Sequence, residues 1–270
     1  MLGLIPLLAG VLGAGGVCPE GKPRLVLATA EGSITADLFE AAAPRTLKRL
    51  AELFADPRFA SSPERTRASG DPPPEPVTFD YTHPHVEIYT SILDKTLFLD
   101  NEIDAAALGL DRDRIADAGK ATDVIQREVV PAVNKIKRGR APDDARLEEW
   151  MGKWRASGTA DFLVGVSRQE INEALGYVYT KGLESRPVTK GALVLQPDSP
   201  KRARARLGIA LSNMPTQLGR QMVIGQVVSG FPLADSISIR PLDVPEGMKS
   251  LDFKPRSPMV VRSVQVVCHD

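Results

Sequence analysis

Three arginines at alternate positions form the densest group of chemistry-bearing side chains in the sequence. They lie in the run Lys201-Arg-Ala-Arg-Ala-Arg206. In an extended strand, alternate side chains share one face, so the three guanidinium groups would line up. Such a row can bind an anion or an acidic peptide in a groove. It can also form a solvated basic edge that prevents strand-to-strand aggregation, and the sequence leaves both interpretations open.

The other titratable residues do not form a recognisable catalytic set. His83 and His85 would share one face of a strand, but no third metal ligand is evident, so no metal site is predicted. Asp143-Asp144 and Glu148-Glu149 are typical of a helix start and of surface charge. There is no glycine-rich phosphate loop and no nucleophile elbow. We therefore expect no cofactor and neither hydrolase nor nucleotide-binding chemistry.

Composition bounds the remaining classes of function. The 34 basic and 34 acidic side chains cancel, so no overall charge draws the chain to nucleic acid or to an acidic membrane. Two cysteines cannot build a disulfide framework or a four-ligand zinc site. With 270 residues and 43% hydrophobic content, the chain can bury one large core, or one core with an appended subdomain.

The N-terminal segment is apolar. Residues 1–17 are uncharged and rich in small residues, and Cys18 follows them. The length fits the core of a signal peptide and is too short for a comfortable membrane span. Small residues before a cysteine are also typical of a lipoprotein signal, in which Cys18 would carry a lipid anchor. The alternative is a buried apolar arm over residues 1–22. We favour export, to a periplasm, to a membrane through that anchor, or out of the cell.

Short apolar runs with turn residues between them predict antiparallel strands near both ends of the chain. Near the C-terminus these runs are Gly191–Leu195, Leu207–Leu211 and Met222–Val228. Near the N-terminus, residues 25–29 and 34–38 alternate around a turn at Glu31-Gly32, and Pro44 opens a helix. Strands this short are typical of a barrel or sandwich.

Taken in their order along the chain, these predicted strands and the helix resemble those of a cyclophilin, a peptidyl-prolyl isomerase. The family's opening strand, hairpin and A-P-x-T helix start are matched at Thr29, Gly32, Ile34, Leu38, Phe39, Ala43, Pro44 and Thr46. Its later S-Q-F-F-I strand, W-L-D-G turn and V-F-G-x-V strand follow in order between Gly191 and Gly230. The resemblance implies a mainly β fold, a closed antiparallel β-barrel formed by residues 23–92 and 161–270.

Residues 93–160 interrupt the resemblance. Their apolar residues keep helical spacing, as at Ile103, Ala106 and Leu110, and two prolines and a glycine divide them into three or four helices. We predict an all-α insertion that offers a surface to a protein partner. Trp150 and Trp154 are expected to pack it against the barrel.

The resemblance also implies a site, in which an arginine donates to the prolyl nitrogen beside a pocket for the proline ring. Position by position, the arginine falls at Val86, next to His85, which matches the family histidine. The pocket phenylalanine of F-M-I-Q falls at Phe162, which keeps its chemistry, and the glutamine falls at Gly165. Phe162 is therefore the leading candidate for catalysis and for proline binding, with His85 as a second catalytic candidate and Val86 as a wall of the pocket.

The remaining positions of the implied pocket lack the side chains that the family uses there. The S-Q-F-F-I strand gives Leu207 and Gly208, and the tryptophan falls at Thr216. Gly208 removes one wall, and loss of one preorganised donor costs about 2.7–4 kcal/mol of transition-state stabilisation. Turnover should lie orders of magnitude below the family norm unless Arg206 reaches the groove and replaces the missing donor.

The family fold pairs its first and last strands, here Leu25–Thr29 and Val260–Val267. That pairing would bring Cys18 near Cys268, and an exported protein could join them in a disulfide. A lipid on Cys18 would exclude this bond.

Two functions of different class remain. The first is an exported prolyl isomerase with weak or absent turnover, acting on proline-containing segments of unfolded or surface-exposed chains. The second is a non-catalytic peptide- or protein-binding module on the same barrel, with the helical insertion as its partner surface. Neither needs nucleic acid or a membrane span.

Overall fold

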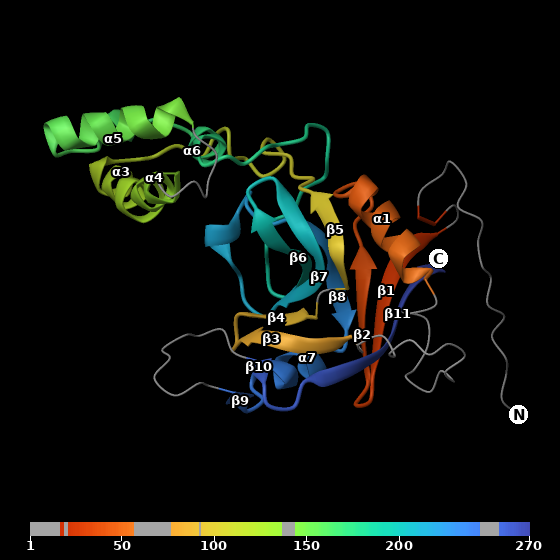
Figure 1. The fold of residues 1–270 in the computed structure, drawn as a ribbon. Coiled ribbons are helices and arrows are strands. Elements are labelled where there is room, and N and C mark those ends of the chain that lie inside the picture. The colour runs from red at the N-terminus through yellow and green to blue at the C-terminus, as the bar shows by residue number, and fades with distance from the viewer. Residues whose placement is uncertain (1–16, 19–20, 57–76, 92, 137–143, 244–253) are drawn as a thin grey trace, which may run out of the picture.

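The computed structural model describes residues 17–18, 21–56, 77–91, 93–136, 144–243 and 254–270 (Figure 1). The strands are β1 (Lys22–Thr29), β2 (Ser33–Leu38), β3 (Thr78–His83), β4 (Glu87–Thr90), β5 (Asp94–Asp100), β6 (Ala192–Ser199), β7 (Arg202–Ala210), β8 (Val223–Ser229), β9 (Leu242–Asp243), β10 (Lys254–Pro255) and β11 (Met259–His269). The helices are α1 (Pro44–Phe54), α3 (Ala118–Val124), η1 (Ile125–Val129), α4 (Val130–Ile136), α5 (Ala145–Ser157), η2 (Asp161–Leu163), α6 (Arg168–Ala174), η3 (Pro215–Gln217) and α7 (Phe231–Ser238).

Antiparallel pairing closes the main sheet into a barrel. The strand order is β4-β3-β11-β1-β2-β8-β6-β7-β5, and β4 also pairs with β7. This second pairing joins the two ends of the sheet, because β4 lies against Gly208–Ala210 while β5 lies further along the same edge of β7. The predicted fold class, a closed antiparallel β-barrel with an all-α insertion, is confirmed.

The two ends of the polypeptide meet in this barrel. β1 pairs with β11 from Lys22↔His269 to Thr29↔Val261. Cys18, which precedes β1, and Cys268, which lies within β11, form a disulfide with their Cα atoms 5.7 Å apart. Residues 1–16, which make up nearly all of the predicted signal sequence, lie outside the described residues.

The period of two in the strands fills the barrel interior. In β1 the residues Leu25 and Leu27 are buried while their neighbours are half-buried, which is the alternation expected of a sheet with one core face. Helix α1 adds Leu47, Leu50 and Phe54 to the same core. It begins at the predicted Pro44, and the buried carboxylate of Glu102 accepts hydrogen bonds from its first free backbone N–H groups.

The helical insertion has a hydrophobic core of its own. It is formed by α3, η1, α4, α5, η2 and α6, which lie beyond one end of the barrel in Figure 1. Trp150 is buried in this core and Trp154 packs against it, so the prediction that the tryptophans pack against the barrel is wrong. Among the described residues, no helix is long and apolar enough to span a membrane.

The boundaries of the insertion differ from the predicted 93–160. Residues 94–100 form strand β5, which pairs with β7, and Leu99 is buried in the barrel core. At the other end, helix α6 continues the insertion to Ala174. β5 is irregular between Asp94 and Phe98, so its apolar residues do not alternate cleanly and the sequence pattern conceals a strand.

Candidate functional site

The outer face of β7, where the resemblance places the proline groove, is built by simple alternation. Leu207 and Ile209 point into the barrel core. The prediction that Leu207 lines the groove is therefore wrong. Arg206 and Gly208 lie on the opposite face. The chemistry available on that face therefore depends on what covers Gly208.

The ring of Tyr89 covers Gly208. The two residues are paired in the β4–β7 ladder, and a Cβ atom added to Gly208 would lie 2.3 Å from the Cε1 atom of Tyr89. Tyr89 is only 2% exposed and packs in a small cluster that we call the outer cluster. Its buried members are Tyr89, Val188, Ala192, Val194, Ala210 and Val223, and the partly buried Phe39, Tyr81 and Met214 pack against them. The Tyr89 ring thus occupies the space that a side chain at position 208 would fill.

The Tyr89 hydroxyl is fully engaged. It donates to a Glu87 carboxylate oxygen at 2.8 Å and accepts from the Gln221 side-chain amide at 2.7 Å. Burial, followed by the negative charge of Glu87, raises the pKa of Tyr89 well above its ordinary value. The phenol therefore stays neutral at physiological pH and cannot act as a base.

Arg206 is held by groups of the barrel itself. Its Nη2 atom lies 2.5 Å from Asp80 Oδ1, its Nη1 atom donates to Gln196, and its Nε–H donates to the Thr90 carbonyl. Its guanidinium also lies 5.1 Å from the ring centroid of Tyr81. The side chain is 11% exposed, so its donors are committed to the fold and do not face an open groove.

The two candidates at the β3–β4 turn differ in exposure. His85 has a φ of 59° and its side chain is 72% exposed, with Nδ1 4.0 Å from Asp235 Oδ1. Val86 is half-buried, and its carbonyl accepts from the Leu211 N–H at 2.7 Å. Val86 therefore ends the β3–β4 turn and binds through its backbone to the residue that follows β7, while His85 is a turn residue in solvent.

Two other candidates lie away from Tyr89 and Gly208. Thr216 is exposed in η3, within the loop between β7 and β8. Phe162 lies in η2 of the insertion, packs against the insertion core and has Lys153 Nζ 5.8 Å from its ring centroid. Phe162 therefore belongs to the insertion, and not to the barrel segment 161–270 in which it was predicted. The following residues cannot continue a strand, because Gly165 has a φ of 85° and Ser167 caps α6.

A charged network joins the insertion to the loop before β8. Glu128 binds Arg168 at 2.9 Å and also pairs with Arg220 of that loop. Arg220 donates to the fully buried Asn172, whose amide donates to the Tyr179 hydroxyl at 2.9 Å. Burial raises the pKa of Tyr179 to about 12, so this hydroxyl serves as a neutral link between helix α6 and the barrel.

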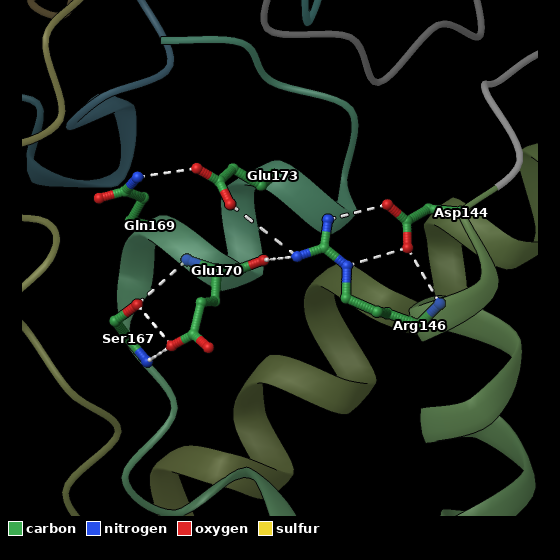
Figure 2. Close-up of polar contacts among 6 residues, drawn as sticks. All are labelled: Asp144, Arg146, Ser167, Gln169, Glu170 and Glu173. Atoms are coloured by element: carbon green, nitrogen blue, oxygen red, sulfur yellow. Dashed lines mark hydrogen bonds and ion pairs between the residues drawn. The ribbon is translucent and has the colours of Figure 1, made fainter. Parts of the chain in front are cut away.

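A second polar group, shown in Figure 2, joins two helices of the insertion. Asp144 caps α5 and binds Arg146 at 2.8 Å, and Arg146 reaches Glu173 of α6. Ser167 and Glu170 form a capping box at the start of α6. Hydrogen bonding to Arg146 lowers the pKa of Asp144. The prediction that Asp144 serves at a helix start is confirmed; Asp143 lies outside the described residues.

No group of three or more metal-ligating side chains occurs in the described part of the chain. The residues that sequence reasoning missed are Tyr89, Tyr81, Asp80 and Gln221. The contact of Tyr89 with Gly208 can be recognised only once the β4–β7 register is known, because the two residues are far apart in sequence.

Comparison with known proteins finds matches among solved structures. No family model and no curated protein sequence matches the chain. Among solved structures, the chain is similar to a cyclophilin-type peptidyl-prolyl cis-trans isomerase of Cryptosporidium parvum, with 13% identity and a TM-score of 0.48 over 92% of this chain and 99% of that one. The same protein in the presence of the dipeptide Ala-Pro gives 14% identity and a TM-score of 0.46, with the same coverage. By its own strand order and closure, this chain folds as a closed antiparallel β-barrel with a helical insertion.

Proposed function

We propose that this chain is a non-catalytic peptide- or protein-binding module built on a cyclophilin-like barrel. The observation that carries the proposal is the ring of Tyr89 packed over Gly208. A prolyl isomerase must hold a proline ring in an open pocket and stabilise a twisted amide, whose rotation faces a barrier of roughly 18–20 kcal/mol. On this face the space beside Gly208 is filled, and the donors of Arg206 are already bound.

The helical insertion is the partner surface in this proposal. It has its own core and projects from the barrel, and Val164 is 44% exposed on it. Phe162 and Trp154 are only partly buried in the same unit. Apolar side chains exposed on a rigid helical unit are typical of protein-binding surfaces.

The second candidate is a prolyl isomerase with weak turnover on proline-containing segments. The sequence motifs that resemble the family, from Thr29 to Thr46 and from Gly191 to Gly230, favour it. In this case Tyr89 would have to leave Gly208 to admit the substrate.

A protease-coupled prolyl isomerisation assay on the full chain separates the two candidates. We expect the rate to equal the uncatalysed rate in the wild type and in Tyr89→Phe, which keeps the ring. Catalysis in the wild type near that of an ordinary cyclophilin would contradict the binding-module proposal. Catalysis that appears only in Tyr89→Ala would support it, because it would identify Tyr89 as the block.

We also propose that the chain is exported. The disulfide between Cys18 and Cys268 supports this location, because such bonds persist in oxidising compartments. With its sulfur in the disulfide, Cys18 cannot carry a lipid at the same time. Alkylation of the protein isolated without reductant should modify neither cysteine, and two reactive thiols or a lipid on Cys18 would contradict the proposal.

A further inference from the structure

An open hollow of about 340 Å³ lies on the outside of the barrel beside β8. It is lined by Phe39, Arg186, Pro187, Thr189, Val223 and Gln226. Phe39 and Val223 also belong to the outer cluster around Tyr89, so the floor of the hollow is apolar and anchored in the barrel. This volume lies at the lower end of the roughly 300–1,000 Å³ of ordinary ligand sites, and it fits one or two peptide side chains.

The cation in this hollow is positioned by an aromatic ring and has no acidic partner. The Arg186 guanidinium carbon lies 3.9 Å from the centroid of Phe39, a stacking distance that fixes the plane of the group. Across the described residues, no carboxylate lies within ion-pairing distance of Arg186, and Glu184 does not pair with it. Elsewhere on the barrel, Arg204 also lies over a ring, that of Phe98 at 5.2 Å, but it is paired with Asp198 at 2.6 Å. Arg186 differs from it in having no acidic partner among the described residues.

A second cation lies next to the hollow in a similar arrangement. Lys190 Nζ lies 4.9 Å from the centroid of Phe231, and the side chain is exposed. Gln226, which lines the hollow, donates its side-chain amide to the Lys190 carbonyl at 2.9 Å. Within the part of the chain that the structure describes, Lys190 also forms no ion pair. Two cations above an apolar floor therefore favour an anionic ligand with an apolar neighbour.

We propose that this hollow binds the carboxylate of a peptide, with the apolar side chain next to that carboxylate packed on Phe39 and Val223. The planar fork of an arginine matches a carboxylate through two parallel hydrogen bonds, and the stack on Phe39 leaves the edge of the fork available. The carboxylate can come from a chain end or from an acidic side chain. The proposal rests on the proposed binding function and names the class of peptide that this module takes.

Fluorescence anisotropy with the full chain tests the proposal. The probes are three fluorescein-labelled peptides: Gly-Ser-Ala-Leu with a free C-terminus, the same peptide amidated, and amidated Gly-Ser-Leu-Glu. Binding of either carboxylate peptide, with the amidated Gly-Ser-Ala-Leu at least roughly 10-fold weaker, is expected from the loss of charge-assisted hydrogen bonds. The free-end and Glu peptides identify which source of carboxylate is used. Equal binding of all three, or no binding at millimolar concentration, would overturn the proposal.

Variants then locate the site. Arg186→Met keeps a long side chain on Phe39 and removes the charge, so affinity for the carboxylate peptide should fall roughly 10-fold or more. Arg186→Lys keeps the charge but loses the planar guanidinium, so its affinity for the peptide should lie between that of Arg186→Met and that of the wild type. The matched control is Arg262→Met, at an exposed arginine of β11 that does not line the hollow, which should bind like the wild type. Unchanged affinity in both Arg186 variants would place binding elsewhere and sink the proposal.

Inorganic phosphate is the remaining competitor. If the Arg186 guanidinium prefers a carboxylate, phosphate should displace the peptide only at concentrations high enough to screen electrostatic attraction in general. Chloride at the same ionic strength should then displace the peptide to the same extent. Displacement by phosphate far below that range would assign the hollow to phosphate and refute the carboxylate. These results do not depend on the isomerisation assay: turnover in the wild type would refute the proposed function, whereas peptide discrimination and the Arg186 variants judge the hollow alone.

Discussion

At the scale of single residues, the pair Tyr89 and Gly208 decides what the face of the barrel can do. Their contact comes from two strands that close the barrel, and the tyrosine ring leaves no room for a side chain at position 208. The Tyr89 hydroxyl is tied to Glu87 and Gln221, which fixes the ring further. A buried tyrosine with both hydrogen-bonding functions satisfied is a stable packing element.

Substitution of Gly208 should therefore be costly. Gly208→Ala places a methyl group against the Tyr89 ring, and overpacking of this kind typically lowers the free energy of unfolding by about 1–3 kcal/mol. Urea denaturation measures the change. The control is Gly152→Ala in helix α5, where the added carbon would meet no atom within 4 Å apart from its chain neighbours and the backbone of its own helix. Alanine should stabilise there by roughly 0.5–1 kcal/mol.

A double variant isolates the contact. If the tyrosine ring is the obstacle, Tyr89→Ala should make Gly208→Ala nearly neutral, so the two effects should not add. An equal loss from Gly208→Ala in the presence and absence of the ring would show that Gly208 is needed for another reason.

The sequence alone could not reveal this pair. The motif match located the strand of Gly208 correctly, and it showed that a pocket aromatic was missing there. What replaces it depends on the register between β4 and β7, which is set by barrel closure rather than by local pattern. Phe162 was misplaced because its apolar run is followed by a glycine and a helix cap, which short-range hydrophobicity does not separate from a strand.

At the scale of elements, a single buried carboxylate joins the beginning and the end of the insertion. Asp104 accepts backbone hydrogen bonds from Ala106 and Ala107 on the entering segment, and from Gly182 and Leu183 on the returning one. Burial by itself would raise the pKa of Asp104, but these donors outweigh it, so the pKa lies below its ordinary value.

This shift predicts an acid-sensitive junction. Because the folded pKa of Asp104 is depressed, its contribution to stability is fully present above the unfolded pKa of about 3.9 and is lost as pH falls through the folded pKa. Asp104→Asn should lower the free energy of unfolding at pH 7 by about 1–3 kcal/mol. The loss should shrink as pH falls toward 3. A difference between variant and wild type that is constant over pH 3–7 would contradict this account of Asp104.

The second link between the insertion and the barrel is the ion-paired network of Glu128. Glu128→Gln removes the negative charge that faces Arg168 and Arg220, which then repel each other. Since these side chains are about a fifth exposed, the loss should be moderate, about 1–2 kcal/mol at low salt, and smaller at high salt. Arg127→Gln on the same helical turn, whose side chain is 79% exposed, is the control and should change stability little. Equal losses from the two variants would exclude a special role for Glu128.

At the scale of the whole molecule, the fold depends on pairing the two ends of the chain. The alternation in residues 25–29 and 260–267 predicted two strands, and the resemblance to the cyclophilin family implied that they pair, as they do. The helical insertion was also predictable as a type, but its limits were not. The bulged strand β5 and the cap of α6 both depend on contacts made after folding.

The disulfide should stabilise this arrangement strongly. It joins residues separated by 250 positions, and loss of a native disulfide typically lowers the free energy of unfolding by about 2–5 kcal/mol. Cys268→Ser should shift the urea midpoint downward, and a reducing agent should produce the same shift in the wild type but none in the variant. A wild-type midpoint that does not respond to complete reduction would show that the β1–β11 ladder suffices.

The most direct test of the account is a nuclear Overhauser measurement on the labelled full chain. We predict strong cross-peaks between the Gly208 α-protons and the Tyr89 ring protons, and no change in them when the dipeptide Ala-Pro is added in excess. Absence of these cross-peaks, or their loss on addition of Ala-Pro, would show that the face of the barrel is open to proline and would contradict the account.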